Sequence, residues 1–191
     1  MSSDPDLDPA VVLRAQRGDH DAFAEVVRHF QGRIHALAYR LTYDAELSRD
    51  VTQDVFLRLH EQFQRYDPAR PFTPWFMTLA TNYALNARAR ARVRRTVSLS
   101  PPGEEAPGID PADADALTGA EASQEAEARR VVRRAIQELP EKYAAVVVLH
   151  YLEGLGVKEI GERLDMPLGT VKIRLYRARN VLREKLERLE G

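Results

Sequence analysis

Hydrophobic residues recur every three or four positions through the first hundred residues of this chain, which is the spacing of one buried face of an α-helix. The spacing predicts a helix over residues 9–17, a second from Ala22 to about Tyr43, and a third from residue 45 to about Phe63. An aspartate precedes each segment, and aspartate is a favoured N-cap because its carboxylate accepts hydrogen bonds from the first backbone N–H groups of a helix. The candidate caps are Asp8, either Asp19 or Asp21, and Asp44.

The segment from Arg65 to Pro74 interrupts this pattern, because it holds three prolines too close together for regular structure. Thr73 followed by Pro74 is typical of a helix start, with threonine as the cap and proline in the first turn. A fourth helix is therefore predicted, with one face formed by Trp75, Leu79 and Tyr83. Because Trp75 shares this stripe, we interpret it as a core residue rather than a stacking platform.

The fourth helix continues into a run rich in arginine, made of Arg88, Arg90, Arg92, Arg94 and Arg95. These positions fall on several faces of a helix, so a protein core cannot accommodate all of them. No segment up to this point alternates with the period of a β-strand, and the first domain is therefore predicted to be all-α.

The composition changes after the arginine run. Residues 98–128 contain no lysine or arginine, carry eight acidic side chains and hold few large apolar residues. Such a segment predicts a flexible acidic linker, which we place at residues 97–127, and residues 1–8 are predicted to be a disordered tail. The linker explains why the whole chain has a net charge of only −1 although both of its flanking domains have strongly basic segments.

A second helical domain is predicted over residues 128–191. A first helix ends at Pro140, an apolar helix runs from Tyr143 to Glu153, and Gly154 is a candidate C-terminal stop. The stretch Gly156–Leu186 then predicts a short helix, a turn at Pro167 and Gly169, and a longer helix capped by Thr170. That longer helix combines an apolar stripe with many basic residues, which is the layout of a helix-turn-helix that reads the DNA major groove.

Several kinds of chemistry are absent from the sequence. There is no cysteine, so disulfides and thiolate metal sites are excluded, and a reducing compartment suits the chain. The five histidines lack the spacing of a metal site, no nucleotide-binding loop or nucleophile motif is present, and no cofactor is predicted. No apolar run approaches the length of a membrane span, so we expect a cytoplasmic protein without membrane insertion.

Two sets of motifs in this order resemble those of the extracytoplasmic-function (ECF) sigma factors, the smallest members of the main bacterial sigma family. The motifs are DVTQDVFLRLH at 50–60, FTPWFMTLATN at 72–82, LPEKY at 139–143, YLEGL at 151–155, KEI at 158–160 and GTVKIRLYRAR at 169–179. The resemblance implies that residues 9–96 are sigma region 2 and that residues 128–191 are sigma region 4. It departs from the usual pattern at Thr81, where arginine is frequent, and at Ile173, where a small polar residue is frequent.

The resemblance also implies a function. Region 2 would bind the clamp helices of the RNA polymerase β′ subunit and read the −10 promoter element, while region 4 would bind the β flap and read the −35 element. The polymerase core would supply all catalysis, so the chain would not be an enzyme. An anti-sigma factor is an expected further partner, and two small helical domains joined by a flexible linker are the expected fold.

Individual residues are carried over from the motifs in three sets. The polymerase-binding set is Asp50, Gln53, Asp54 and Arg58, on the outer side of the third helix. The −10 set is Phe72, Thr73, Asn82, Asn86, Arg88, Arg90 and Arg92, some of which would hold a base flipped out of the non-template strand. The −35 set is Thr170, Lys172, Ile173, Arg174, Tyr176 and Arg177, near the start of the recognition helix.

Two other functions fit parts of the sequence. A helix-turn-helix regulator that binds DNA without polymerase could have a similar C-terminal helix, but its other domain would normally contain strands. An all-helical adaptor could use the arginine run to bind RNA or a protein partner. Promoter-specific initiation with added core polymerase would distinguish the sigma-factor function from both.

Overall fold

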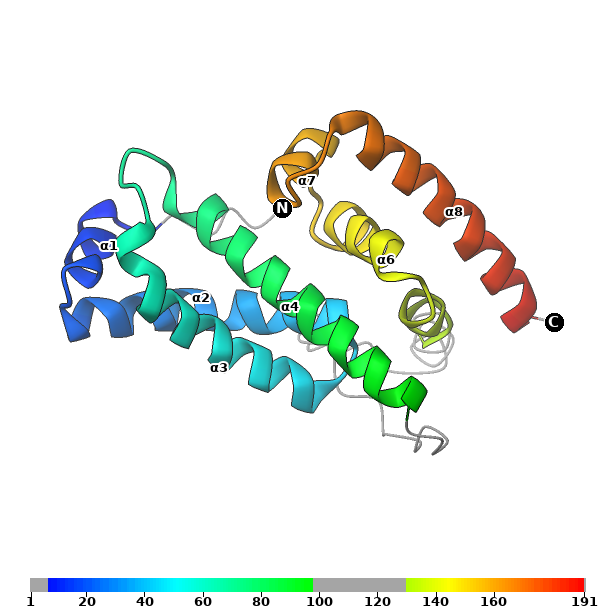
Figure 1. Ribbon diagram of the computed structural model, residues 1–191, viewed down its shortest axis with the longest axis horizontal. Coiled ribbons are helices and arrows are strands. Elements are labelled where there is room, and N and C mark those ends of the chain that lie inside the picture. The colour runs from blue at the N-terminus through cyan, green and yellow to red at the C-terminus, as the bar shows by residue number, and fades with distance from the viewer. Residues whose placement is uncertain (1–6, 98–129, 191) are drawn as a thin grey trace, which may run out of the picture.

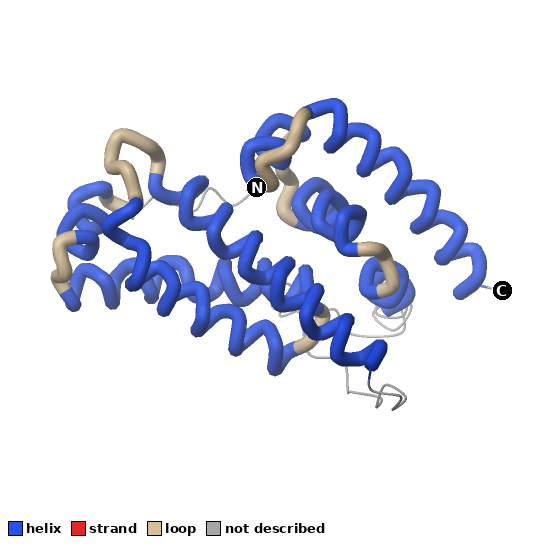
Figure 2. The backbone as a smooth tube through the Cα atoms, viewed as in Figure 1, coloured by secondary structure: helices blue, strands red, loops and turns tan. Residues whose placement is uncertain are grey.

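The computed structural model describes residues 7–97 and 130–190, and all regular structure within these two ranges is helical (Figures 1 and 2). The first domain consists of α1 (Pro9–Gln16), α2 (His20–Thr42), α3 (Ala45–Gln62), the 3₁₀ turn η1 (Phe63–Arg65) and α4 (Phe72–Val97). The second consists of a helix whose described part is residues 130–137, α6 (Glu141–Val147), the π-helical turn η3 (Val148–Leu152), α7 (Val157–Arg163) and α8 (Leu168–Glu190). The predicted all-α fold with two small helical domains is confirmed. The predicted tail, except for Leu7 and Asp8, and the predicted linker, except for Val97, lie outside the described residues.

Three aspartates form the predicted caps. Asp8 accepts a hydrogen bond from the Ala10 backbone N–H at 2.8 Å, and Asp44 accepts one from Leu47 at 2.8 Å. Asp19 rather than Asp21 caps α2, since its carboxylate accepts from the Ala22 N–H at 3.0 Å. Each cap satisfies an N–H group that has no partner within its own helix, which fixes where the helix begins.

The cap at Asp19 gives a pH-dependent prediction. The Ala22 N–H is the main cause that lowers the pKa of the Asp19 carboxyl below its ordinary value, and Arg14 lowers it further. A carboxyl whose pKa falls on folding stabilises the protein above its unfolded pKa, and this contribution is lost as the pH falls through the folded pKa. Asp19→Ala is therefore expected to lower the Tm at neutral pH, and the difference from the parent protein should narrow below about pH 4.

Thermal unfolding followed by circular dichroism between pH 3 and pH 7 would measure this difference. Asp21→Ala is the control, because the Asp21 side chain is exposed and does not cap the helix. A difference in Tm that stays constant across this pH range would contradict the assignment of the effect to the ionised cap.

The core of the first domain lies between α2, α3 and α4, with α1 packed against α2. Its largest fully buried side chains come from all three of these longer helices and include Phe30, Ile34, Leu37, Leu41, Val51, Leu59, Phe76 and Met77. The stripes predicted for α2 and α3 supply the buried side chains of those helices, but in α4 the buried face is that of Phe76 and Met77, and the predicted stripe of Trp75, Leu79 and Tyr83 is half-buried beside it. Burial of such side chains is the main force that holds amphipathic helices together. This bundle positions the outer face of α3 and the exposed face of α4.

The core of the second domain is built on the apolar segment Ala144–Leu149, every residue of which is buried. Ile160 of α7 and Val171, Leu175 and Ala178 of α8 pack into the same core. The predicted helix over 143–153 forms as α6 followed by the wider turn η3, and it stops before Gly154, whose φ of +70° is easily adopted by glycine.

Two helix starts differ from the sequence prediction. α4 begins at Phe72 and α8 begins at Leu168, so neither Thr73 nor Thr170 is an N-cap. In α8 the carbonyl of Pro167 already accepts the first helical hydrogen bond, from the Val171 N–H at 3.1 Å. Because α4 and α8 begin before these positions, the two threonine side chains lie within the first helical turns instead.

The two domains pack against each other. α6 and α7 lie against α4, and η3 lies against α2, so the second domain covers one side of the first (Figure 1). Buried apolar side chains from both domains form one continuous cluster. None of the helices described in either domain is long and apolar enough to cross a membrane.

Candidate DNA and polymerase interfaces

The turn between α7 and α8 is held by backbone contacts. The Met166 N–H donates to the carbonyl of Gly161 at 2.8 Å, and Asp165 adopts a left-handed backbone conformation with φ of +49°. At the other end of α7, the Glu159 carboxylate accepts from the Gly156 N–H at 2.7 Å. The predicted helix-turn-helix is present, and these bonds fix how α8 is presented.

The predicted −35 residues lie together on the accessible side of α8. Val171, Leu175 and Ala178 are buried on the opposite side, which sets the rotation of the helix. Thr170 and Arg174 are half-buried, while the four exposed members are Lys172, Ile173, Tyr176 and Arg177. Ile173 and Tyr176 are 53% and 61% exposed, and large apolar side chains grouped in water with basic ones are typical of a binding surface.

The loop between η1 and α4 is anchored by hydrogen bonds from its own ends and from α1. The Tyr66 hydroxyl donates to the carbonyl of Arg70 at 2.6 Å. The Gln16 side-chain amide donates to the carbonyls of Phe63 and Tyr66 at 2.9 and 2.8 Å. Burial is the main cause that raises the pKa of Tyr66, which therefore stays a neutral donor at physiological pH. The exposed residues 67–71 are thus presented as a tied loop.

Phe72 differs from the sequence expectation of a DNA contact. Its side chain is only 8% exposed, and its ring stacks on those of Phe63 and Phe76 with centroids 5.6 and 5.4 Å apart. Tyr66 and Trp75 pack against it as well, with centroids 5.2 and 5.9 Å away. Phe72 therefore belongs to the aromatic cluster on which the loop rests. Trp75 is half-buried in the same cluster and packs against the core, as predicted.

Three of the predicted −10 residues form one exposed stripe on α4. Asn82, Asn86 and Arg90 are spaced four residues apart and are all exposed. The Arg90 Nε donates to the carbonyl of Asn86 at 3.3 Å, and its guanidinium lies 6.0 Å from the Tyr83 ring centroid. Thr73 is half-buried in the first turn of the same helix. The stripe offers amide and guanidinium donors along the helix axis.

Arg88 does not belong to this exposed stripe but lies between the two domains. Its side chain is buried, 7% exposed, and its guanidinium donates to backbone carbonyls of both domains rather than facing solvent. Burial is the main cause that lowers the pKa of Arg88, and the neighbouring Arg92 lowers it further. Arg92 is exposed but also donates to the Leu139 carbonyl at 3.0 Å. In this arrangement Arg88 is not accessible to a phosphate, and Arg92 is partly engaged.

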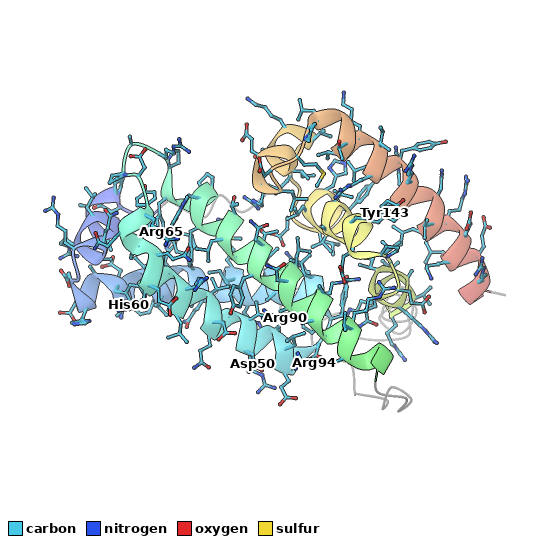
Figure 3. The ribbon with its side chains drawn as sticks, viewed as in Figure 1. Asp50, His60, Arg65, Arg90, Arg94 and Tyr143 are labelled. Atoms are coloured by element: carbon cyan, nitrogen blue, oxygen red, sulfur yellow. The ribbon has the colours of Figure 1, made fainter. Side chains whose placement is uncertain are left out.

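The four predicted polymerase-binding residues, Asp50, Gln53, Asp54 and Arg58, are all exposed on α3. An open groove of about 690 Å³ runs between α3 and α4, and its lining includes Asp50, Asp54, Arg90 and Arg94. Figure 3 shows Asp50 and Arg94 close to one another at the same end of the two helices. The Tyr83 hydroxyl donates to the Asp54 carboxylate at 3.3 Å, so the predicted polymerase surface and the exposed face of α4 adjoin.

One exposed residue of α3 was missed by the sequence analysis. Leu57 is 56% exposed between Gln53 and Arg58, and with Phe23, Val27 and Phe56 it lines an apolar groove of about 440 Å³ between α2 and α3. Its exposure could have been predicted from the sequence, because Leu57 lies outside the buried stripe formed by Val51, Val55 and Leu59. Exposed apolar surface beside charged residues suits a protein partner.

Within residues 7–97 and 130–190, no group of three potential metal-binding side chains comes together. His150 is half-buried and contacts the Leu155 carbonyl, and His35 contacts the Ser48 hydroxyl. These contacts show packing and hydrogen-bonding roles for both side chains.

Two sigma-factor family models match the chain. The model described as sigma-70 region 2 matches residues 26–94, and the model described as sigma-70, region 4, matches residues 129–182. The first match covers α3 and most of α2 and α4, and the second covers α6, η3, α7 and most of α8.

Whole-length relatives agree with these matches. The ECF RNA polymerase sigma factor SigW of Bacillus subtilis is 31% identical over 179 residues, covering 93% of this chain and 96% of SigW. The RNA polymerase sigma-H factor of Pseudomonas aeruginosa is 32% identical over 184 residues, covering 95% of each chain. Among solved structures, the sigma factor RpoE of Bartonella quintana, in complex with the anti-sigma factor NepR, has the same fold, with a TM-score of 0.62 at 20% identity over 86% of this chain and 96% of RpoE. This chain therefore belongs to the ECF sigma factors of the sigma-70 family.

Proposed function

We propose that the surfaces on α3, α4 and α8 carry the three tasks of a sigma factor, namely polymerase binding, −10 recognition and −35 recognition. The observation that carries the proposal is the α8 surface, where four of the six predicted −35 residues are exposed and the other two are half-buried. Backbone hydrogen bonds hold the helix-turn-helix to which this surface belongs. Family membership supports RNA polymerase as the partner and promoter-specific initiation as the outcome. A regulator that works without polymerase is not favoured, because the first domain matches sigma region 2.

In the −35 interface, α8 enters the major groove with its N-terminal half. Arg174 and Arg177 are the residues suited to bidentate contacts with guanine, and Ile173 is suited to a thymine methyl group. Thr170, Lys172 and Tyr176 flank them and reach the adjoining backbone. The helix-turn-helix has the geometry that this docking requires.

In the −10 interface, the tied loop 67–71 and the stripe of Asn82, Asn86 and Arg90 receive the non-template strand. Extruding a base costs a few kcal/mol of lost stacking, which donors such as the two amides and Thr73 must offset. Arg92, and Arg88 when the domains separate, add contacts to phosphates. Phe72 contributes by supporting the loop.

In the polymerase interface, the mixed surface of Asp50, Gln53, Asp54 and Arg58 meets the β′ clamp helices, with Leu57 as an apolar anchor. The second domain meets the β flap. The chain itself catalyses no reaction and works in the cytoplasm, where an anti-sigma factor is a further partner. The complex of RpoE with NepR supports a partner of this kind, because RpoE has the same fold as this chain.

A reconstituted transcription assay tests the proposal. The purified chain is added to core polymerase from the same cells, and run-off transcripts are mapped on genomic fragments. We expect discrete start sites that depend on the chain. Lack of binding to core polymerase would overturn the sigma-factor proposal.

The −35 interface gives a separate prediction. Arg174→Ala and Arg177→Ala are each expected to weaken binding of a mapped promoter duplex about tenfold, which corresponds to one good bidentate contact. Fluorescence anisotropy with promoter and scrambled duplexes measures the change. Arg188→Ala, near the far end of the same helix and also exposed, is the matched control for lost charge. An equal loss on both duplexes would show that these arginines contact only phosphates.

A further inference from the structure

Gln16, the last residue of α1, ties this helix to the turn η1 that leads into the loop 67–71 (Figure 1). Its side-chain amide donates to the carbonyls of Phe63 and Tyr66 at 2.9 and 2.8 Å. In the opposite direction, the Gln64 side-chain amide donates to the backbone carbonyl of Gln16 at 2.5 Å. Gln16 precedes the segment that matches sigma-70 region 2, so its role cannot be taken from that match.

The two bonds from Gln16 fix the direction in which the chain leaves η1. A side-chain amide carries two N–H donors on one nitrogen, which matches the two carbonyls, three residues apart, that this nitrogen contacts. The carbonyl of Phe63 also accepts from the Tyr66 N–H at 3.1 Å, which closes the turn. Because Gln16 is half-buried, these hydrogen bonds are stronger than they would be in open water. The end of α1 thus holds the backbone at the entrance of the loop.

Tyr66 carries this constraint across the loop. Its carbonyl is held by Gln16 on one side, and its hydroxyl donates to the carbonyl of Arg70 at 2.6 Å on the other. Tyr66 is only 6% exposed, and its ring packs against those of Phe72 and Trp75 with centroids 5.2 and 5.1 Å away. A packed aromatic side chain therefore links the Gln16 contact to the far end of the loop.

We propose that Gln16 is a positioning residue for −10 recognition: through its amide, α1 sets where the loop 67–71 stands relative to the exposed stripe on α4. The proposal rests on the proposed function for the recognition of DNA, but not for the hold on the loop. A binding site needs its parts held to within roughly 0.5 Å, which requires supporting hydrogen bonds behind the groups that touch the ligand. Contacts to bases specify a sequence, whereas contacts to phosphates supply position and affinity. Loss of the Gln16 bonds should therefore weaken discrimination among −10 bases more than it weakens binding.

The hold on the loop is measured first, on the full chain without DNA or polymerase. Trp75 is the only tryptophan of the chain, and its ring packs against Tyr66, so its fluorescence reports on the base of the loop. Gln16→Ala is expected to raise acrylamide quenching of Trp75 and to speed hydrogen exchange of the loop amides several-fold. Gln16→Glu keeps the size of the side chain but presents acceptors to two carbonyls, so it should act as Gln16→Ala does. Arg17→Ala, at the exposed next position, is the matched control and should change neither readout.

The effect on recognition is measured with core polymerase on matched promoters. One promoter pair differs by one base within the −10 element, and a second pair differs by one base within the −35 element. Gln16→Ala is expected to lower the ratio of run-off transcripts for the −10 pair about threefold to tenfold, the range that corresponds to one hydrogen bond. The ratio for the −35 pair should stay unchanged. Tyr66→Phe, which removes only the hydroxyl that holds the Arg70 carbonyl, should lower the −10 ratio as well.

General destabilisation would lower transcription from both members of a pair alike and would leave both ratios unchanged. Circular dichroism shows whether each variant is folded, and Tyr66→Phe tests the loop independently of Gln16. Unchanged quenching and exchange in the folded Gln16 variants would overturn the hold on the loop, as would a Gln16→Glu variant that behaves as the parent does. A loosened loop with an unchanged −10 ratio would overturn the role in recognition.

The two measurements also separate this proposal from the proposed function. A parent chain that directs no promoter-specific initiation would count against the proposed function and against the role of Gln16 in recognition. Fluorescence and hydrogen exchange need neither DNA nor polymerase, so they would still decide whether Gln16 holds the loop.

Discussion

Replacement of Gly161 by alanine is expected to destabilise the second domain by about 2 kcal/mol, the usual range for an overpacked site. A Cβ atom at this position would lie 2.8 Å from the carbonyl oxygen of Met166 and 3.2 Å from the Leu168 Cδ2 atom. The first of these is backbone, which cannot move away as a flexible side chain could. The same turn carries the Met166-to-Gly161 hydrogen bond, so relief of the clash would tilt α8 away from α7.

Chemical denaturation monitored by circular dichroism measures the stability change, and anisotropy on a promoter duplex measures the loss of −35 binding. Gly169→Ala is the matched control, because a Cβ atom there meets nothing within 4 Å and the residue lies in the first turn of α8. Alanine is a better helix former than glycine, so this variant should be as stable as the parent or slightly more stable. Equal destabilisation by the two variants would contradict the close-approach argument.

The sequence predicted those features that depend on neighbours within one or two helical turns. The caps at Asp8, Asp19 and Asp44 need only a carboxylate and a free N–H three residues away or fewer. The buried stripe of α8 follows from the spacing of its apolar residues, and this spacing alone determines that Ile173 and Tyr176 face outward. Both domains and their order could therefore be inferred from periodicity and motifs.

The placement of Phe72 and Arg88 could not be inferred in this way. Five arginines lie within eight residues of the basic run, and although helical spacing puts Arg88 in line with the buried Ala80 and Ala84, an arginine at such a position is normally expected to reach solvent. Arg88 is buried because carbonyls of residues 41 and 136–139 come together around it, up to 51 positions away in sequence. Phe72 is buried because the rings of Phe30, Phe63 and Phe76 converge on it from three different elements. The burial of both side chains is therefore determined by tertiary packing.

Contacts around Asp54 connect the predicted polymerase-binding surface of α3 with the predicted −10 surface of α4, which the sequence motifs define separately. Asp54 accepts a hydrogen bond from Tyr83, and the Arg90 guanidinium lies near the face of the Tyr83 ring. A partner that contacts Asp54 therefore also acts on a side chain that helps to position Arg90. The surfaces proposed for polymerase binding and for DNA binding by the first domain are in this way physically adjacent, on the side of α4 that carries its exposed stripe.

Arg88→Ala is expected to lower the stability of the full chain by about 3 kcal/mol, because several carbonyls at the domain interface lose a charged donor. Arg88→Lys should recover little of this loss, since an ammonium group cannot reproduce the planar fork that reaches both domains. Chemical denaturation of the full chain measures both variants. Arg94→Ala is the control, because Arg94 is exposed in an open groove and its removal should change stability by less than about 0.5 kcal/mol. A lysine variant as stable as the parent would show that positive charge alone, and not the geometry of the guanidinium, holds the two domains together.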